Sequence, residues 1–310
     1  MAVSTGNAND YLDLLAKLVT FLTTSTDLVN ANQAWALVTD STAPLVVGAN
    51  TIDHTYYLRA PGLSNTDQIY INLRAFHNAS SDYWNIEARG AMGYVPSNTF
   101  ETQPNSSPGA FAYLWNQPGK PIPYWFIANG QRVIVIAKVS TVYEWFYLGF
   151  PNRYGTPGQH RMPLFIGGSG VNGNLRYSQA DWTHMAFWDG CGAFFFTTDA
   201  TWQTVRNWVP LNANPQAEAI NNVWPWQYDG SNTLNWMSPN LDGTYSVLPA
   251  RMECTSQTTG NVWGEFDGLG FVTGSGSSAE DTYQINGETW QQFPNIFRSG
   301  LSSYAAVRMV

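Results

Sequence analysis

The stretch PYWFIANGQRVIVIAKVSTVYEWFYLGF, residues 123–150, is the longest apolar and β-branched run in the chain. Branched and aromatic side chains favour extended backbone, because they fit a pleated surface and lose rotamer freedom in a helix. Asn-Gly, found here at Asn129-Gly130, is the preferred pair for a two-residue hairpin turn with positive φ at both central positions. The sequence therefore predicts a hairpin of strands at 124–128 and 131–139. A further strand is predicted at 141–150, most simply a continuation of the second strand past a bend.

The strand at 141–150 carries large side chains on both sides. Tyr143, Trp145 and Tyr147 alternate with a glutamate, a phenylalanine and a leucine. A strand with large side chains on both faces is typical of the middle of a sandwich or of a contact with a neighbouring chain. We therefore expect Tyr143, Trp145 and Tyr147 to form a core or interface cluster.

The first 30 residues differ from the rest of the chain. Asp10 or Asn9 can cap a helix, and apolar residues follow at helical spacing from Tyr11 to Leu22. This pattern predicts one amphipathic helix of about 12 to 14 residues. The helix packs either on the chain's own sheet or into a partner subunit, and the sequence leaves both alternatives open.

From Gln33 onward, the pattern is one of strands separated by turns rich in Pro, Gly and Asn. Strands are predicted at 33–39, 55–60, 68–75, 83–88, 164–166, 290–293 and 304–310, and loops at 96–123, 151–170 and 210–239. The expected fold is mainly β: an antiparallel β-sandwich, one large or two smaller, with the amphipathic helix at its N-terminus. The expected division is a helical segment at 1–30, a β domain at 31–170 and a second β region at 171–310, which belongs to the same domain or forms its own.

Two stretches of the second half resemble each other. AFWDGCGAFFF begins at Ala186 and GEFDGLGFVTG begins at Gly264, and each places an Asp-Gly pair after an aromatic residue. Asp-Gly favours turns, so Asp189 and Asp267 are interpreted as turn residues. An internal repeat and two equivalent turns of one sandwich both remain open.

The composition restricts the classes of partner. Charged residues make up 12% of the chain, about half the usual share, while aromatic residues reach 15%. So few charged residues indicate that other protein covers much of the surface. The alternative is a monomer whose surface is rich in Asn, Ser, Thr and Gln. The net charge of −8 argues against nucleic-acid binding, which needs Lys and Arg to replace phosphate counterions.

The targeting and redox signals are few. The N-terminus lacks the basic and apolar regions of a signal peptide, and no run of about 18 apolar residues predicts a membrane-spanning helix. Cys191 and Cys254 are too few for a disulfide framework, so free buried thiols are favoured over a single bridge.

No constellation predicts catalysis, a metal or a cofactor. The four histidines (His54, His77, His160 and His184) show no zinc-ligand spacing, and nucleotide-binding and nucleophile motifs are absent from the sequence. Five carboxylates are candidates for a glycosidase pair, but no spacing places two of them across a cleft: Glu87, Glu144, Asp189, Glu265 and Asp267. Glu144 could be a buried acid with a raised pKa, although pairing at an interface or exposure to solvent is the preferred interpretation. We therefore expect a protein that is not an enzyme.

The tryptophans have two interpretations. They fill cores and interfaces, or they form faces on which sugars stack. Trp224 and Trp226, in the predicted loop at 210–239, are the residues we would assign to a glycan contact.

Several segments together resemble a poorly characterised family of structural proteins from the virions of tailed bacteriophages and prophages. They are NANDYLDLLAKLVTFLTT, YWFIANGQRVIVIAKVSTVYEWFYLGF, PLFIGGSG, WGEFDGLGFVTGSG, QQFPNIFR and SYAAVRMV, spread over nearly the whole chain. The resemblance implies a tail or baseplate component, and brings no catalytic residues with it. It implies a homo-oligomer that contacts other virion proteins, assembled in the bacterial host cytoplasm. A collar or head-decoration protein, or a module that binds host-surface glycans, is the alternative.

Overall fold

The computed structural model is described over most of the chain. The described residues are 1–42, 44–155, 160–181, 183–189, 192–205, 221–226, 246–254, 261–297, 300–301 and 303–309, without the side chains of 221, 222, 224, 253, 254 and 261. Within them the fold is mainly β, with helices only near the N-terminus apart from one 3-10 turn, η1 (Phe187–Asp189). The prediction of a mainly β chain with an N-terminal helix is confirmed.

The smaller of two sheets contains six strands. Its order is β2-β4-β5-β6-β7, with β3 also on β4, and every pairing is antiparallel. The strands are β2 (Ala36–Ser41), β3 (Leu45–Val47), β4 (Asn50–Ala60), β5 (Ile69–Asn78), β6 (Tyr83–Ala91) and β7 (Ala110–Leu114). The predicted strands at 33–39, 55–60, 68–75 and 83–88 correspond to β2, β4, β5 and β6. The segment at 96–123 is not a single loop, because it contains β7 and the beginning of the next strand.

The larger sheet contains fourteen strands and takes its members from both ends of the chain. Its order is β1-β8-β9-β10-β12-β13-β14-β15-β16-β17-β20-β19-β18, with β11 on β17. All its pairings are antiparallel except β14 with β15. The strands are β1 (Ala2–Ala8), β8 (Ile122–Ala128), β9 (Arg132–Val139), β10 (Val142–Gly149), β11 (Asn152–Arg153), β12 (Phe165–Gly168), β13 (Ala193–Phe196), β14 (Trp202–Val205), β15 (Asn221–Trp224), β16 (Leu248–Cys254), β17 (Asn261–Phe271), β18 (Thr282–Ile285), β19 (Glu288–Pro294) and β20 (Tyr304–Arg308). Since β12 pairs with β13, the sheet continues across residue 170.

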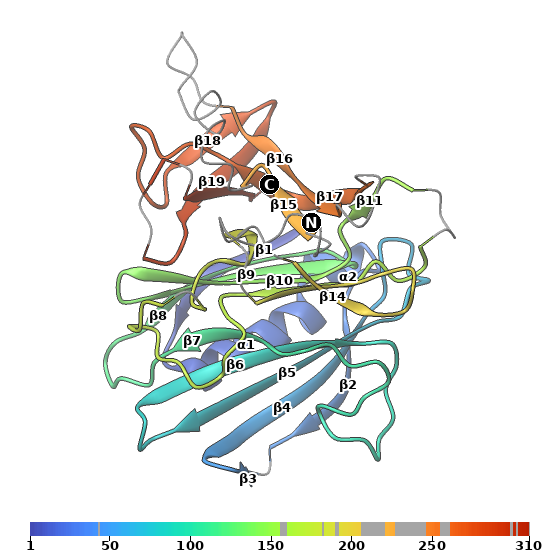
Figure 1. Ribbon diagram of the computed structural model, residues 1–310, viewed down its shortest axis with the longest axis vertical. Coiled ribbons are helices and arrows are strands. Elements are labelled where there is room, and N and C mark those ends of the chain that lie inside the picture. The colour runs from blue at the N-terminus through green and yellow to red at the C-terminus, as the bar shows by residue number, and fades with distance from the viewer. Residues whose placement is uncertain are drawn as a thin grey trace, which may run out of the picture.

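Helix α1 (Tyr11–Thr24) lies between the two sheets (Figure 1) and contacts strands of both. The Asp10 side chain caps it by accepting the N–H of Asp13 at 2.8 Å, as the sequence predicts. Its apolar residues, including Leu15, Leu18 and Leu22, are buried in a core shared with both sheets. The helix therefore packs within its own chain, and a short helix α2 (Thr26–Asn30) follows it. Strand β1, which precedes it and pairs with β8, was not predicted.

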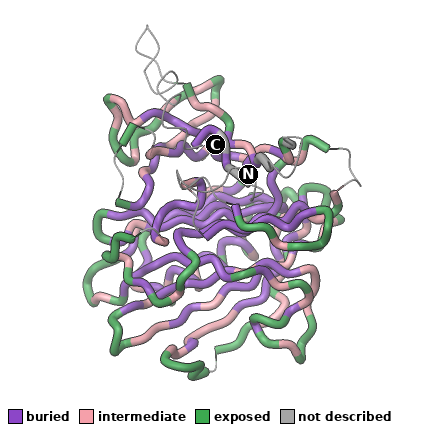
Figure 2. The backbone as a smooth tube through the Cα atoms, in the orientation of Figure 1, coloured by how far each residue is buried: buried purple, intermediate pink, exposed green. Residues whose placement is uncertain are grey.

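Strands β8, β9 and β10 form a layer that is covered on both faces (Figures 1 and 2). In β9, Val133 and Val135 join the core that contains α1, while Ile134 and Ile136 join a second core beneath the returning strands β16–β20. This alternation follows from the two-residue period of a strand. Strand β10, for which large side chains on both faces were expected, is likewise buried on both faces within its own chain.

The turns around β9 differ from the predictions. Strand β10 does not continue β9 but folds back against it, through a turn in which Ser140 has a φ of 59°. The hairpin of β8 and β9 is present, yet neither Asn129 nor Gly130 has positive φ. Instead, Asn129 Oδ1 accepts the N–H groups of Gln131 and Arg132 at 3.0 and 3.1 Å.

The two Asp-Gly stretches are not structurally equivalent. Asp189 ends the 3-10 turn η1, whereas Asp267 lies inside strand β17, next to Gly268 with a φ of 74°. The interpretation of Asp267 as a turn residue is wrong, because the chain remains paired on both sides of it through a register shift. In contrast, Asn286 and Gly287 both have positive φ in the turn between β18 and β19, as is typical of an Asn-Gly pair in a two-residue hairpin turn.

Candidate functional site

The structure places Tyr143, Trp145 and Tyr147 together in the second core, on one face of β10. The Trp145 ring meets Trp188 edge-on, with centroids 4.6 Å apart, and its indole N–H donates to the carbonyl of Pro294 at 3.3 Å. The Tyr143 hydroxyl reaches Glu280 at 2.5 Å, and burial together with this hydrogen bond raises the pKa of Tyr143 to about 12. Each of these side chains is therefore covered by the C-terminal part of its own chain.

The two tryptophans assigned to a glycan contact are not a surface pair. Trp226 is 7% exposed and packs on Trp188 and Phe271, with centroid distances of 5.3 and 5.6 Å. These are the surroundings of a core side chain, so the assignment of Trp226 to a glycan contact is corrected. The Trp224 side chain lies outside the described residues, as do most of the predicted loop at 210–239, residue Cys191 and the side chain of Cys254.

Glu144 and His184 form a buried ion pair in a closed site. His184 Nε2 lies 2.7 Å from Glu144 Oε1, and His184 Nδ1 lies 3.0 Å from the carbonyl of Gln179. Both ring nitrogens face oxygen atoms, an arrangement that suits an imidazolium donating from both nitrogens. Burial disfavours this charge, but the attraction of Glu144 and the hydrogen bonds outweigh it and raise the pKa of His184. Glu144 also accepts the N–H of Tyr113 at 3.1 Å, which makes it a paired buried acid and not a solvent-facing one.

The other weighed carboxylates have separate partners. Asp189 accepts an amide N–H of Asn295 at 2.7 Å, and Glu265 accepts the hydroxyl of Tyr154 at 2.8 Å. Asp267 pairs with two arginines, Arg132 at 2.8 Å and Arg308 at 2.7 Å, and so ties β9 to the last strand. Among the described residues, no group of three or more His, Cys, Asp and Glu is placed to hold a metal ion.

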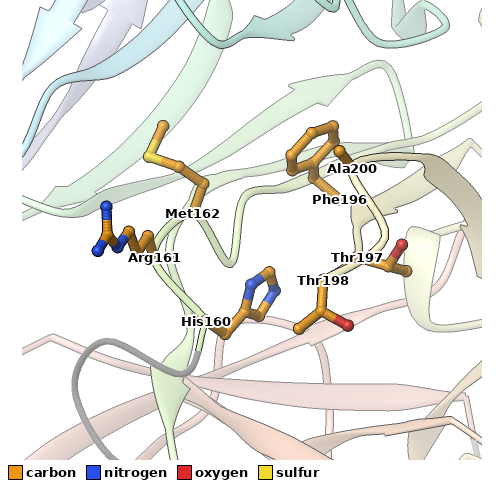
Figure 3. Close-up of a pocket in the computed structure, with 7 residues that line it drawn as sticks. All are labelled: His160, Arg161, Met162, Phe196, Thr197, Thr198 and Ala200. Carbon is orange, nitrogen blue, oxygen red and sulfur yellow. The ribbon is translucent and has the colours of Figure 1, made fainter.

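A cavity of about 330 Å³ lies beside His160 (Figure 3). Figure 3 shows the His160 ring and the side chains of Met162, Phe196 and Thr198 around this space. Burial, and less strongly the nearby Arg153, lower the pKa of His160 despite a hydrogen bond to the Phe196 backbone. Its Nε2 atom is buried without a hydrogen-bond partner in the described part of the chain. The ring packs edge-on against Phe195 and Trp263, with centroid distances of 5.6 and 5.3 Å.

A second cavity, of about 200 Å³, lies on the outer face of the smaller sheet and is called the outer cavity below. Its lining includes Arg74 on β5 and Glu87 and Arg89 on β6. The residues next to them in the two strands belong to the core on the inner face: Leu73, Ala75, Ile86 and Ala88. Since side chains alternate along a strand, Arg74, Glu87 and Arg89 point to the outer face. Its lining also includes two aromatic, two amide and one aliphatic side chain: Phe76, Phe111, Asn50, Asn174 and Val47.

The floor of the outer cavity is a fixed network of charges. Arg74 Nε and Nη2 lie 2.8 and 2.7 Å from Glu87 Oε2, and Arg89 Nε lies 2.7 Å from Glu87 Oε1. Arg74 Nη1 also pairs with Glu101 at 2.5 Å, and the Phe100 ring lies 4.4 Å from the Arg74 guanidinium carbon. Two arginines and two glutamates cancel in charge, and their mutual contacts hold the guanidinium groups in place.

The β3 hairpin carries an exposed apolar run at an edge of the smaller sheet. Leu45, Val46 and Val47 are 60%, 72% and 48% exposed. Within the described residues, β3 and β2 each pair only with β4, so both form a sheet edge. The hairpin projects at the bottom of the molecule in Figure 1 and is coloured as exposed in Figure 2.

Sequence reasoning found neither the outer cavity nor the exposed hairpin. The signal for the first was the alternation in β5, where the apolar Leu73 and Ala75 flank Arg74. The signal for the second was the apolar run at 45–47 between Pro44 and Gly48, which is too short to define a strand or its buried face.

The amino-acid sequence was compared with protein-family models and with curated protein sequences. No protein-family model matches the chain, and no curated protein sequence matches it. Among the described helices, none is both long and apolar enough to cross a membrane.

Proposed function

We propose that the chain is a structural subunit of a bacteriophage particle, in the tail or baseplate, that assembles by symmetric association of its copies. The proposal rests on the resemblance of its segments to virion structural proteins and on one observation in the fold. That observation is the exposed apolar β3 strand at an unpaired sheet edge. A collar or head-decoration position fits the same properties.

The edge of the smaller sheet, formed by β2 and β3, is protected by a register shift in β2, by Pro44 and by the shortness of β3, but hardly by charge. Monomeric β proteins protect such edges with charged side chains, especially Lys, because unpaired N–H and C=O groups accept another strand. The run ALVTDSTAPLVV at 36–47 contains a single charge, Asp40, which lies 2.5 Å from His54 Nε2. An apolar edge without net repulsion is complementary to itself, so its occupant is a second copy of the chain, paired edge to edge.

The layered arrangement suits such a subunit. We infer an antiparallel β-sandwich in which β8–β10 form the shared inner layer. Helix α1 and the smaller sheet lie on one side of this layer, and the returning strands of the larger sheet lie on the other. The buried alternation of β9 supports this inference, since a strand apolar on both faces needs a layer on each side.

The proposal predicts that the protein is part of purified particles. Mass spectrometry of purified phage should detect the chain at many copies per particle, and gold-labelled antibodies against it should mark one position by electron microscopy. Labelling of the tail or baseplate supports the proposal, and labelling of the collar or head supports the alternative position. A protein that is abundant in infected cells but absent from purified particles would overturn it.

A further inference from the structure

We propose that the outer cavity is a binding site for one neutral pyranose ring of a saccharide. This inference goes beyond the assembly role, and it does not need a second copy of the chain. It rests on the hydrogen-bond donors, the charge balance, the apolar walls and the size of the cavity.

The lining of the cavity offers more hydrogen-bond donors than the protein uses. A guanidinium group carries five N–H donors. Arg74 directs three of its nitrogens at Glu87 and Glu101, while Arg89 donates to Glu87 and to the carbonyl of Ser107 at 3.0 Å. N–H groups of both arginines therefore remain for a ligand rich in oxygen acceptors.

The two asparagines at the cavity add further donors. The hydroxyl of Tyr83 contacts Oδ1 of Asn50 and lies 2.9 Å from Oδ1 of Asn174. Since a hydroxyl donates only one hydrogen, one asparagine accepts it and the other turns its amide N–H toward the Tyr83 oxygen; the N–H groups of the accepting asparagine point away from Tyr83. Hydroxyl oxygens of a sugar accept from such donors.

The charge balance selects a neutral ligand. Glu87 is buried, and its two oxygens are occupied by Arg74 and Arg89; Glu101 pairs with Arg74 on the exposed side. The four charges cancel, so an anion would gain little net attraction from the cavity. A ligand without charge keeps the network intact and uses only the N–H groups that remain.

The walls and the size fit one sugar ring. Phe76 and Phe111 meet edge-on, with centroids 6.1 Å apart, and are 3% and 9% exposed, so they offer a ligand only a small part of their apolar surface. Gly173 allows its loop to close on them, since a Cβ at this position would lie 2.8 Å from Phe111 Cε1. At about 200 Å³ the cavity is smaller than pockets for drug-sized ligands, which measure about 300–1,000 Å³.

Nuclear magnetic resonance of the wild-type protein tests this site without any mutation. Glucose, galactose, mannose and N-acetylglucosamine would be titrated separately, with glucuronate as the charged probe, while the Nε–H signals of Arg74 and Arg89 are followed. We expect at least one neutral sugar to shift both signals saturably at millimolar concentrations. No shift with any neutral sugar, shifts only at other residues, or a response to glucuronate alone would overturn the proposal.

A pair of variants then tests the assigned contacts. Asn174→Leu removes an amide at the cavity, and Asn7→Leu makes the same change on exposed strand β1 of the other sheet. We expect Asn174→Leu to weaken binding of the responding sugar by about tenfold or more, and Asn7→Leu to leave it unchanged. Equal affinity of both variants would contradict the assignment, and thermal melting of each checks that it is folded.

Discussion

Strand β10 and strand β3 are both dominated by apolar side chains, yet the fold treats them in opposite ways. Every residue of β10 is buried, and its two faces lie in two different cores. Every residue of β3 is exposed, on a hairpin at the edge of the smaller sheet. The chain has layers enough to cover β10 from both sides, and none of its described segments covers β3. The difference separates apolar surface that holds the subunit together from apolar surface that remains for a second copy.

The largest expected effect comes from opening the core at β10. Trp145→Ala should lower the free energy of unfolding by about 3–5 kcal/mol, because it leaves a cavity among Trp188, Phe293 and their neighbours. Urea denaturation followed by circular dichroism measures it. Trp290→Ala, at a half-buried position of β19, is the matched control and should cost clearly less. Equal losses in the free energy of unfolding would mean that the buried face of β10 contributes no more to stability than a half-buried position.

The next effect concerns Glu144, the charged residue of β10. Glu144→Gln should cost about 1.5–3 kcal/mol, because the His184 imidazolium loses a buried charge-assisted hydrogen bond. The same denaturation experiment measures the loss. If the double variant Glu144→Gln with His184→Gln loses the full sum of the two single losses, the residues do not act as a pair.

The stability of this pair depends on pH with a defined sign. The folded-state pKa of His184 is raised above the unfolded value, so its stabilisation is complete below about pH 6.5 and is lost as the pH rises through the folded pKa. Glu144 on β10, Asp181 in its own loop and Tyr113 on β7 are the titratable groups around it. Melting temperatures should be measured from about pH 5 to about pH 9, which spans the titration of histidine. They should show this loss of stability in the wild type and not in His184→Gln.

His160 should give the opposite dependence. Its folded-state pKa is lowered, so the unfolded chain binds the proton more readily and stability falls as the pH drops below about 6.5. Comparison of His160→Gln with the wild type at pH values below neutrality isolates this contribution. A wild-type curve that His160→Gln leaves unchanged in this range would contradict the buried, uncharged state of the ring.

The smallest expected effect on stability comes from the exposed strand. Val46→Lys should change the free energy of unfolding by less than about 0.5 kcal/mol, because the side chain is on the surface of the single subunit. A loss as large as that of Trp145→Ala would show that β3 is part of the core, and the contrast with β10 would fail.

The burial of β9 and β10 on both faces can be predicted from the sequence, because it follows from a local pattern. Alternating apolar residues in 133–148 determine both faces of β9 and β10, and the Asp10 cap determines where α1 begins. Strand β1 cannot be predicted from its own residues, because Gly6 and Asn7 are poor strand formers. It is a strand because it pairs with β8.

The remaining features depend on contacts between distant residues. The Asn129-Gly130 turn is shaped by the indole N–H of Trp35, which donates to the Asn129 carbonyl at 2.9 Å, and by Asp267, which accepts its amide. A Cβ at Gly130 would lie 2.1 Å from the Gly62 carbonyl oxygen, so close packing and not positive φ requires this glycine. The outer cavity likewise needs the register of β5, β6 and β7 and a loop from residues 171–177, which no local pattern encodes.

The most direct test of edge-to-edge assembly is the solution mass of wild-type protein and Val46→Lys, measured by light scattering over a range of concentrations. Val29→Lys, an exposed valine on α2, is the control for an added charge. We predict a defined oligomer for the wild type and for Val29→Lys, and a folded monomer for Val46→Lys. A wild-type monomer at every concentration, or a Val46→Lys oligomer equal to the wild type, would contradict assembly through β3.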